Sequence, residues 1–451
     1  MKLSRFVNVI EDGDSFIIFH SQMGGACRVD SGILNILKNI ESFGDTNDSN
    51  ILEVMNEFKN KGFLVDDDID YLSHSGNEQL FQRESGKQIK TIQLVVSNNC
   101  NFKCKYCFEN SIYCSPERDL YQHDAENKIM KTEDAISYVD KIIKFVKDDK
   151  RVALHIQFFG GEPLTNKNAI YGVLDEYGDG SKYGIDISYS IVTNGSLIDD
   201  ECAGYFAKYG VGVVVSFDSP KKSDRDMKSG HNSIEKTNEI LDILRKHDAY
   251  VAFNSVLGEA TYNYFDNSIV DYALEKGVKE IGVVLDLEPS FYDKFDYRSI
   301  GEKLISLVRY GNDKGVLISG YWMSSFLSLL EEHEYAKGFK TCSGTGAQLS
   351  IEPNGKIFAC KGSSAYYGDV NDMRVLVNSD NYVKYFSRSL NNSNDCCDCE
   401  LCGVCSGFCL GPLEQTFGDI NHTVSSYCRL IKYVVMQLLK EERGLDVYEV
   451  E

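Results

Sequence analysis

The sequence predicts an α/β fold built around a partial (β/α)6 barrel, with a winged-helix-like module before it and a cysteine-rich region after it. Three observations lead to this prediction. Between about residues 90 and 320, short apolar runs alternate with segments of helical periodicity, as in parallel strands joined by crossover helices. The first eighty residues place three extended runs before two helical ones. After residue 340 the composition shifts toward cysteine and glycine.

The N-terminal module is expected over residues 1–80. Its elements are the extended runs Arg5–Val9, Ser15–His20 and Ala26–Val29, a helix capped by Asp30 or Ser31, a helix capped by Ser49, and a last strand Phe63-Leu64-Val65. This order of strands, helices and wing is a winged-helix pattern. Residues Ser73 to Gln88 are polar, contain two glycines and are expected to form a linker.

The charge of this module favours a peptide over DNA as its ligand. The clusters Glu11-Asp12-Gly13-Asp14 and Asp66-Asp67-Asp68 would repel phosphate. The whole chain has a net charge of -21, which also argues against nucleic acid as a partner. A domain that caps the barrel and binds nothing is the alternative interpretation.

Six barrel strands are expected within residues 90–320. They are Ile92–Ser97, Val152–Phe159, Ile185–Thr193, Val211–Phe217, Tyr250–Val256 and Glu280–Leu287. The clearest helices begin at Thr132 and lie near Ile234–Lys246 and Ile300–Gly311. In barrels of this kind the chemistry lies at the carboxyl ends of the strands. The loops that follow the strands are therefore where functional residues are expected.

The loop after the first strand carries Cys100, Cys104 and Cys107. Three thiolates within eight residues can hold three irons of a cubane cluster, and the fourth iron is then left without a protein ligand. Three buried or zinc-binding cysteines are the alternative. The spacing C-x3-C-x2-C, with an aromatic residue before the last cysteine, resembles the radical S-adenosylmethionine superfamily. The resemblance implies that the open iron chelates S-adenosylmethionine and that Tyr106 lies beside its adenine.

Motifs after later strands agree with this resemblance. Gly160-Gly161-Glu162-Pro163 is similar to the superfamily's GGEP motif, whose glycines bring the backbone close to the cofactor and whose acid receives its ammonium group. A Gly-Gly turn with a solvated glutamate is the alternative. The resemblance further implies that polar residues at the ends of the next three strands line the ribose and methionine part, namely Asn194, Ser216, Asp218 and Asn254.

Residues 335–430 resemble the SPASM domain, which binds auxiliary iron–sulfur clusters. The matching residues are Cys342, Gly355, Cys360, Cys396, Cys399, Cys405, Cys409 and Cys428. Seven thiols cannot fill two cubane clusters, which need eight. The family's wiring implies that Cys396, Cys399, Cys405 and Cys428 hold the second auxiliary cluster, and that Cys342, Cys360 and Cys409 hold a first one with an open iron. Alternatively, Cys397 or Cys402 fills that iron, or the region holds two zinc sites.

The other cysteines are expected to be incidental. Cys114 lies in a polar insert, Glu109 to Lys131, and Cys27 and Cys202 are isolated, as buried thiols often are. Residues 431–451 are expected to be a helix and a tail. That helix, near Tyr427–Glu442, is expected to pack on its own domain.

The chain is expected to be cytoplasmic. It has no segment like a signal peptide and no apolar run approaching about 18 residues, so no membrane contact is expected. Fifteen cysteines, most of them clustered, favour metal clusters over disulfides in a chain without an export signal. The resemblances imply S-adenosylmethionine, three [4Fe-4S] clusters and an electron donor such as flavodoxin or ferredoxin.

Together the resemblances imply an enzyme that matures ribosomally made peptides, with the N-terminal module binding the leader of a precursor by strand addition. We expect thioether cross-links, as in sactipeptide and ranthipeptide synthases, because an open auxiliary iron suits a substrate thiolate. In that scheme a 5′-deoxyadenosyl radical removes hydrogen from carbon and the cysteine sulfur bonds to it. Carbon–carbon or carbon–oxygen cross-linking, or formylglycine formation on a sulfatase, is the first alternative. A non-catalytic electron carrier or peptide-binding scaffold is the second.

Overall fold

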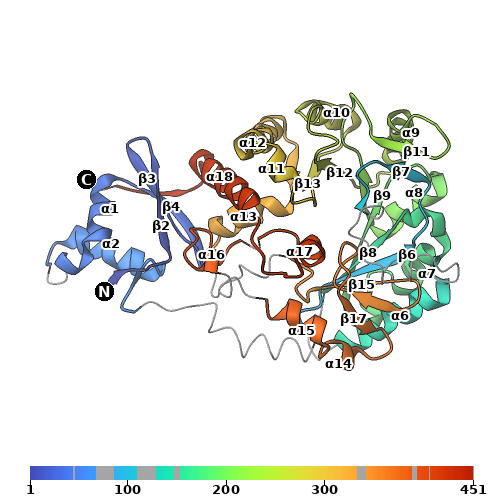
Figure 1. The fold of residues 1–451 in the computed structure, drawn as a ribbon, viewed down its shortest axis with the longest axis horizontal. Coiled ribbons are helices and arrows are strands. Elements are labelled where there is room, and N and C mark those ends of the chain that lie inside the picture. The colour runs from blue at the N-terminus through green and yellow to red at the C-terminus, as the bar shows by residue number, and fades with distance from the viewer. Residues whose placement is uncertain are drawn as a thin grey trace.

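The computed structural model describes residues 1–43, 46–67, 86–108, 128–146, 153–332, 342–388, 394–405 and 407–449. Cys114, most of the polar insert after Cys107 and most of the expected linker lie outside these ranges. The predicted α/β fold class is confirmed. The largest sheet among the described residues has ten strands, in the order β14-β13-β12-β10-β9-β8-β6-β15-β16-β17 (Figure 1).

Six consecutive strands of the sheet are the predicted barrel strands. They are β6 (Thr91–Ser97), β8 (Ala153–Gly160), β9 (Asp186–Thr193), β10 (Gly212–Ser216), β12 (Val251–Leu257) and β13 (Glu280–Leu285). All neighbours among them pair in parallel. A seventh parallel strand, β14 (Leu317–Ser319), extends the row and was not predicted. Three residues are too few to show a periodicity.

Helices cover the outer face of the barrel strands. They are α6 (Thr132–Val146), α7 (Lys167–Tyr177), α8 (Asp200–Tyr209), α9 (Ser233–Lys246), α10 (Ser268–Lys276) and α12 (Tyr297–Lys314). In β8 the residues Leu154, Ile156 and Phe158 are buried in the main core, whereas the alternate residues His155 and Gln157 are only half-buried. This period of two separates a helix-facing side from a polar concave side.

The N-terminal module contains an antiparallel meander of β2 (Val7–Asp12), β3 (Ser15–His20) and β4 (Gly24–Val29). A two-stranded ladder, β1 (Lys2–Leu3) with β5 (Leu64–Val65), lies beside α1 (Ser31–Lys38) and α2 (Ser49–Asn60). Asp30 caps α1 as expected, but the cap of α2 is Asp48 and not Ser49. The carboxylate of Asp48 accepts from two backbone amides of the first turn, which the Ser49 hydroxyl does not.

The module is less independent than its sequence suggests. Ile18 and Phe58 belong to a small core of its own. The flanking residues Ile17 and Phe19 of β3 instead belong to the main core of the chain. Strand β3 therefore has a buried residue on each face, and the module is packed against the rest of the protein rather than tethered to it.

The cysteine-rich region continues the barrel sheet. Strand β15 (Gln348–Ile351) pairs in parallel with β6, and β16 (Lys356–Phe358) and β17 (Tyr366–Asp369) follow antiparallel. Gly355 has φ +80, as the predicted Asn-Gly turn requires. Because β6 leads into the cysteine loop at Cys100, the region holding Cys360 is hydrogen-bonded to the strand that presents Cys100.

The C-terminal helix α18 (Ser425–Glu441) lies along α12 of the barrel and against α13 (Ser324–Leu330) (Figure 1). The expectation that it packs on its own domain is therefore wrong. Gly301 of α12 permits the close approach, since a β carbon there would lie 2.6 Å from the ring of Tyr433. Among the described helices, none is both long and apolar enough to cross a bilayer.

The last described residues return to the N-terminal module. Strand β18 (Asp446–Tyr448) pairs in parallel with β4, so the four-stranded sheet has the order β18-β4-β3-β2. The N-terminus and the last described residues therefore both lie at this module (Figure 1). Sequence patterns did not predict this strand, because its three residues carry no alternation and its partner lies about 420 positions earlier in the chain.

Candidate active site

A short ladder holds the loop with Cys100, Cys104 and Cys107. Strand β7 (Phe102–Cys104) pairs antiparallel with β11 (Arg225–Met227), which places Cys104 opposite Arg225. The Nζ of Lys228 donates to the carbonyl oxygen of Cys100 at 2.8 Å. The loop is thus fixed from the segment after β10, more than a hundred residues away in the sequence.

The thiols of this loop interact electrostatically with one another. Burial raises the pKa of the Cys100 thiol, and Cys107 adds to that shift. Burial likewise raises the pKa of Cys104, with Cys100 among the further causes. Gathering buried thiolates without a counter-ion is unfavourable, so this donor set fits an iron–sulfur cluster that supplies the positive charge. Each cysteine of a cubane binds its own iron.

Two predicted cofactor residues, Tyr106 and Asp218, touch each other. The hydroxyl of Tyr106 donates to the carboxylate of Asp218 and accepts from Nη1 of Arg225 at 3.1 Å. Arg225 and Asp218 form an ion pair at 4.0 Å. The Nε of Arg225 is buried and has no acceptor among the described residues. Sequence reasoning missed Arg225, although its guanidinium contacts Tyr106 and Asp218, two predicted site residues.

The two glycines of the Gly160–Pro163 motif allow close backbone contact with the cysteine loop. The amide of Gly161 donates to the carbonyl oxygen of Ser97 at 2.9 Å, and the amide of Glu162 donates to that of Asn99 at 2.7 Å. A β carbon at Gly160 would lie 2.0 Å from the carbonyl oxygen of Ser97. One at Gly161 would lie 2.7 Å from that of Asn99. No larger residue fits between the end of β8 and the loop.

The carboxylate of Glu162 is almost fully buried, with 1% of the residue exposed. Its Oε1 accepts from Thr193 Oγ1 at 2.6 Å and from the amide of Leu164 at 3.1 Å. Its Oε2 accepts from the amide of Asn194 at 2.8 Å. Burial raises the pKa of Glu162, and these bonds lower it. Since each carboxylate oxygen can accept two bonds, Oε2 has room for one more donor.

Asn194 lies beside the cysteine loop, and Ser216 lies beside Asn254. The Nδ2 of Asn194 donates to Oδ1 of Asn101 at 2.9 Å. Ser216 and Asn254 are register partners at the carboxyl end of β10 and within β12. The predicted cofactor residues therefore share one end of the sheet with the cysteine loop.

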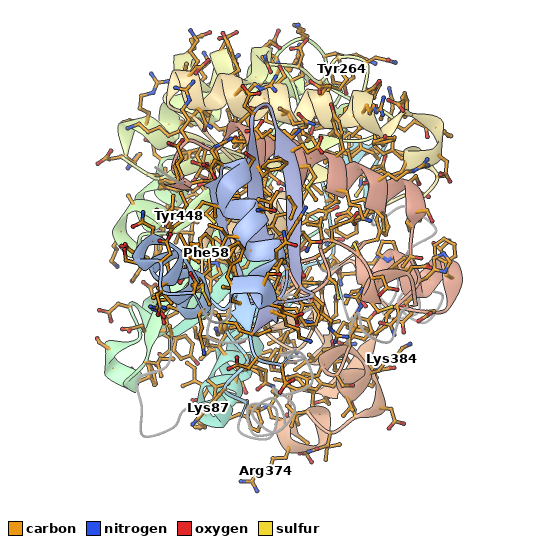
Figure 2. The ribbon with its side chains drawn as sticks, turned by 90° about the vertical axis from the view of Figure 1, so that its left-hand side faces the viewer. Phe58, Lys87, Tyr264, Arg374, Lys384 and Tyr448 are labelled. Atoms are coloured by element: carbon orange, nitrogen blue, oxygen red, sulfur yellow. The ribbon has the colours of Figure 1, made fainter. Side chains whose placement is uncertain are left out.

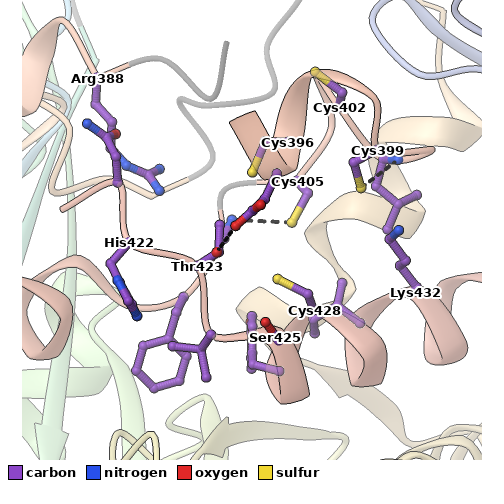
Figure 3. A pocket seen from close by; sticks show the side chains of 18 residues that line it. Arg388, Cys396, Cys399, Cys402, Cys405, His422, Thr423, Ser425, Cys428 and Lys432 are labelled. Carbon is purple, nitrogen blue, oxygen red and sulfur yellow. Dashed lines mark hydrogen bonds between the residues drawn. The ribbon is translucent and has the colours of Figure 1, made fainter. Parts of the chain in front are cut away.

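The seven C-terminal cysteines that match the SPASM pattern have neighbours within the sets that the resemblance implies. Burial raises the pKa of Cys409 well above its usual range, and Cys360 and Cys342 add to the shift. The second group surrounds a cavity of about 200 Å³. Figure 3 shows the sulfurs of Cys396, Cys399, Cys405 and Cys428 around one common space.

Two further thiols lie near the second group. Cys402 is buried, with 3% exposed, and lines the same cavity. Its sulfur lies at the far end of the loop from Cys428 (Figure 3). Cys397 is exposed and lines a different, polar cavity of about 390 Å³, together with Arg5 and Gln22. Among the described residues, no three side chains are placed to share a single metal ion.

A buried polar network connects the radical-cluster loop with the C-terminal region. The Nζ of Lys361 donates to Oδ1 of Asn98 at 2.7 Å and pairs with Glu352 at 3.4 Å. Asn98 donates in turn to Glu352 at 3.0 Å. Lys361 and Glu352 are 4% and 3% exposed. Because Lys361 follows Cys360 and Asn98 lies two residues before Cys100, this network fixes the separation of two predicted cluster sites.

Comparison with known proteins agrees with this geometry. The model of the radical SAM superfamily matches residues 94–272. The radical SAM cyclopropyl synthase TigE of Paramaledivibacter caminithermalis is 45% identical over 463 aligned positions, which cover 100% of this chain and 98% of that relative. The cysteine-type anaerobic sulfatase-maturating enzyme of Clostridium perfringens is 22% identical, and the alignment covers 76% of this chain and 95% of that enzyme.

A solved structure resembles nearly the whole chain. Streptococcus suis SuiB bound to precursor peptide SuiA superposes with a TM-score of 0.57 and 16% identity, and the match covers 95% of this chain and 100% of that one. At this identity the likeness concerns the fold, including the N-terminal and C-terminal parts that flank the barrel.

Proposed function

Because the chain belongs to the radical S-adenosylmethionine superfamily, we propose that it forms a cyclopropane ring within a residue of a ribosomally made precursor peptide. One observation carries this proposal. The chain is 45% identical to a cyclopropyl synthase along the full length of this chain and nearly all of that relative. Its identity to a sulfatase-maturating enzyme is half of that, at 22%, which makes formylglycine formation the weaker choice.

A peptide substrate is supported by the shape and charge of the N-terminal module. Its meander presents a strand edge, the feature to which extended peptides add. Its hairpin tip is acidic, with Glu11 and Asp14 exposed, which disfavours nucleic acid. A similar fold is seen in SuiB bound to a precursor peptide.

The reaction class sets what the site must do. S-adenosylmethionine bound at a [4Fe-4S] cluster supplies a 5′-deoxyadenosyl radical that takes one hydrogen atom from carbon. Ring closure then forms one carbon–carbon bond and breaks a second C–H bond. That hydrogen leaves as a proton and an electron. In this scheme Cys100, Cys104 and Cys107 hold the cluster, and Oε2 of Glu162 accepts from the cofactor's ammonium group.

Other residues would hold and enclose the cofactor. Tyr106 presents its ring to the adenine, and the unpaired Nε of Arg225 offers a donor beside it. Asn194, Ser216, Asp218 and Asn254 line the remaining surface. The seven C-terminal cysteines would hold two auxiliary clusters, which accept the surplus electron and pass it to a carrier such as flavodoxin or ferredoxin.

Thioether formation is a second candidate, favoured by one observation. Cys409 interacts electrostatically with Cys360 and Cys342, and a cubane held by these three thiolates would have one iron without a protein ligand. A substrate thiolate could bind there, since iron and sulfur are a soft pair. Cys397 is exposed and Cys402 lines the cavity of the second group, and this supports a substrate thiolate as the fourth ligand rather than either of them.

Both candidates remove two hydrogens from the peptide, and the fate of the substrate thiols separates them. The purified, anaerobically reconstituted protein is incubated with S-adenosylmethionine, a reductant and the precursor encoded beside its gene. Cyclopropane formation predicts a two-hydrogen loss with every cysteine still alkylatable. Loss of one alkylatable thiol per two hydrogens would favour the thioether. An unchanged peptide would contradict both.

A further inference from the structure

Asp286 follows directly on strand β13 and continues the concave side of the barrel sheet. In β13 the residues Ile281, Val283 and Leu285 are buried in the main core, whereas the alternate residues are half-buried. The amide of Asp286 donates to the carbonyl oxygen of Leu257 at 3.0 Å, which extends the pairing of β13 with β12 by one residue. Because side chains alternate along a strand, the half-buried Asp286 belongs to the concave set.

The loop after β12 leaves room for this carboxylate. A β carbon at Gly258 would lie 2.4 Å from Oδ2 of Asp286. That oxygen accepts from the amide of Glu259 at 2.8 Å, and Oδ1 accepts from the amide of Glu288 at 3.0 Å. The amide of Leu287 is a further donor. Since a carboxylate can accept about four hydrogen bonds, the group keeps a position for a proton.

The charge of this carboxylate is not neutralised by a cation. No ion pair among the described residues includes Asp286. Two other carboxylates at the carboxyl ends of the strands are paired, Asp218 with Arg225 at 4.0 Å and Glu352 with Lys361 at 3.4 Å. Burial raises the pKa of Asp286, and its backbone hydrogen bonds lower it. A carboxylate in such surroundings is a stronger proton acceptor than one in water.

On one side, the carboxylate adjoins the predicted cofactor residues. Oδ1 of Asp218 accepts from the amide of Val256 in β12 at 3.0 Å. In the loop after β12, Tyr264, at the top of Figure 2, donates to Asp224 at 2.9 Å. The carbonyl oxygen of Asp224 accepts from the amide of Lys105 in the cysteine loop at 3.2 Å. The loop that supports the carboxylate is thus bonded to the segments around the predicted radical cluster.

On the other side, contacts lead to the first auxiliary group. The hydroxyl of Tyr292 donates to the carbonyl oxygen of Asp286 at 2.7 Å. The ring of Tyr292 packs edge-on against Phe408, the residue before Cys409, with 5.6 Å between centroids. The hydroxyl of Tyr321 interacts electrostatically with both Cys409 and Asp286. Contacts from Asp286 therefore lead both to the predicted cofactor residues and to thiols predicted to hold an auxiliary cluster.

We propose that Asp286 takes the proton that ring closure releases. This inference rests on the proposed function, because the proton arises in that reaction. Once the 5′-deoxyadenosyl radical has removed a hydrogen atom, the carbon radical gives one electron to an oxidised iron–sulfur cluster and becomes cationic. The electron pair of a C–H bond two carbons away then forms the ring bond, and its hydrogen passes as a proton to the carboxylate. The side chain thus loses one hydrogen atom, one electron and one proton.

An asparagine variant separates this role from a structural one. Asp286→Asn retains an oxygen for the amide of Glu288, as the turn requires, but has no carboxylate to take a proton. Asp286→Glu retains the carboxylate on a longer side chain, which does not suit the turn. Asp179→Asn is the matched control, because Asp179 is exposed and also accepts from an amide two residues on, that of Ser181 at 2.9 Å.

The experiment measures ring product and 5′-deoxyadenosine by mass spectrometry, with the precursor encoded beside the gene as the probe. We expect Asp286→Asn to lower the amount of ring product per 5′-deoxyadenosine about a hundredfold, since a positioned proton acceptor contributes about 10²-fold to 10⁴-fold. Cofactor cleavage without peptide and the thermal unfolding midpoint should stay unchanged. Asp286→Glu should restore part of the product, and Asp179→Asn should match the unmodified chain.

A ratio in Asp286→Asn equal to that of the unmodified chain would overturn the proposal. Should Asp286→Asn lower the unfolding midpoint, Asp286→Glu decides. Ring product from that variant is the expected result, and its absence would overturn the proposal. A thioether or an unchanged peptide from the unmodified chain would instead contradict the proposed function, whatever the variants do.

Discussion

At the scale of single residues, the site is organised around Glu162. Its carboxylate accepts bonds from Thr193 and Asn194 at the end of β9, and its backbone amide donates to Asn99 of the cysteine loop. The charge is buried, and its remaining acceptor position is on Oε2. A buried carboxylate with one unused acceptor is suited to a cationic group of a ligand.

Glu162→Gln should weaken S-adenosylmethionine binding by about 10-fold to 100-fold, because a hydrogen bond to a charged group contributes about 1.5 to 3 kcal/mol. Equilibrium binding of the cofactor and release of 5′-deoxyadenosine both measure this. Glu176→Gln is the control, since Glu176 lies on α7 and pairs with Lys182 at 3.0 Å. Equal effects of the two substitutions would contradict the assignment of Glu162 to the cofactor-binding site.

Lys361 is a second residue whose surroundings give a definite expectation. Lys361→Met leaves the buried Glu352 without its ion pair, which costs about 3 to 5 kcal/mol when one partner of a buried pair is removed. Thermal unfolding followed by circular dichroism should show a clearly lowered midpoint. Lys246→Met, in an ion pair with Asp200 whose two side chains are 68% and 61% exposed, should change the midpoint little. A midpoint as high as that of the unmodified chain would contradict the role given to Lys361.

At the scale of elements, the barrel strands were predictable, but the short strand pairings that hold the cysteine-bearing segments were not. Alternation of strands and helices marked all six barrel strands, and turns after them marked the site. The ladder of β7 with β11 and the pairing of β15 with β6 join residues more than a hundred positions apart. Each involves three or four residues, which is too few for a periodic signal. Arg225 and Lys361 were missed for that reason.

The contact between the glycine motif and the cysteine loop gives a prediction at this scale. In Gly161→Ala, the new β carbon would meet the backbone oxygens of Asn98 and Asn99 within 3.0 Å, so the loop must move. We expect reduced iron content and little 5′-deoxyadenosine. Gly204→Ala is the matched control, because its β carbon would approach nothing closer than 3.8 Å. Normal iron and activity in Gly161→Ala would show that the loop tolerates displacement.

At the scale of the whole molecule, the strands that lead to Cys100 and to Cys360 belong to one sheet, whereas Cys428 lies on α18, which packs on α12. The resemblance to the SPASM domain, and not spacing by itself, implied which cysteines belong to which group. Sequence patterns could not predict that α18 packs on α12 or that β18 pairs with β4. Those contacts depend on the shapes of surfaces such as that at Gly301.

The cysteine groups predict the iron content. The reconstituted chain should hold three cubane clusters, or about 12 irons, and replacing Cys100, Cys104 and Cys107 together with alanine should leave about eight. Release of 5′-deoxyadenosine should then be abolished. Cys397→Ala should change neither quantity, since this thiol is exposed. Cofactor cleavage that persists in the triple variant would contradict the assignment of the radical cluster.

The most direct test of the account uses a precursor whose branched aliphatic residues carry deuterium, with the mass of 5′-deoxyadenosine and of the peptide measured after a single turnover. Cyclopropane formation predicts deuterium in 5′-deoxyadenosine and the loss of two deuterium atoms from the peptide, because both broken bonds are C–H bonds of one side chain. Loss of one deuterium and one ordinary hydrogen, together with one alkylatable thiol, would contradict ring formation and favour the thioether.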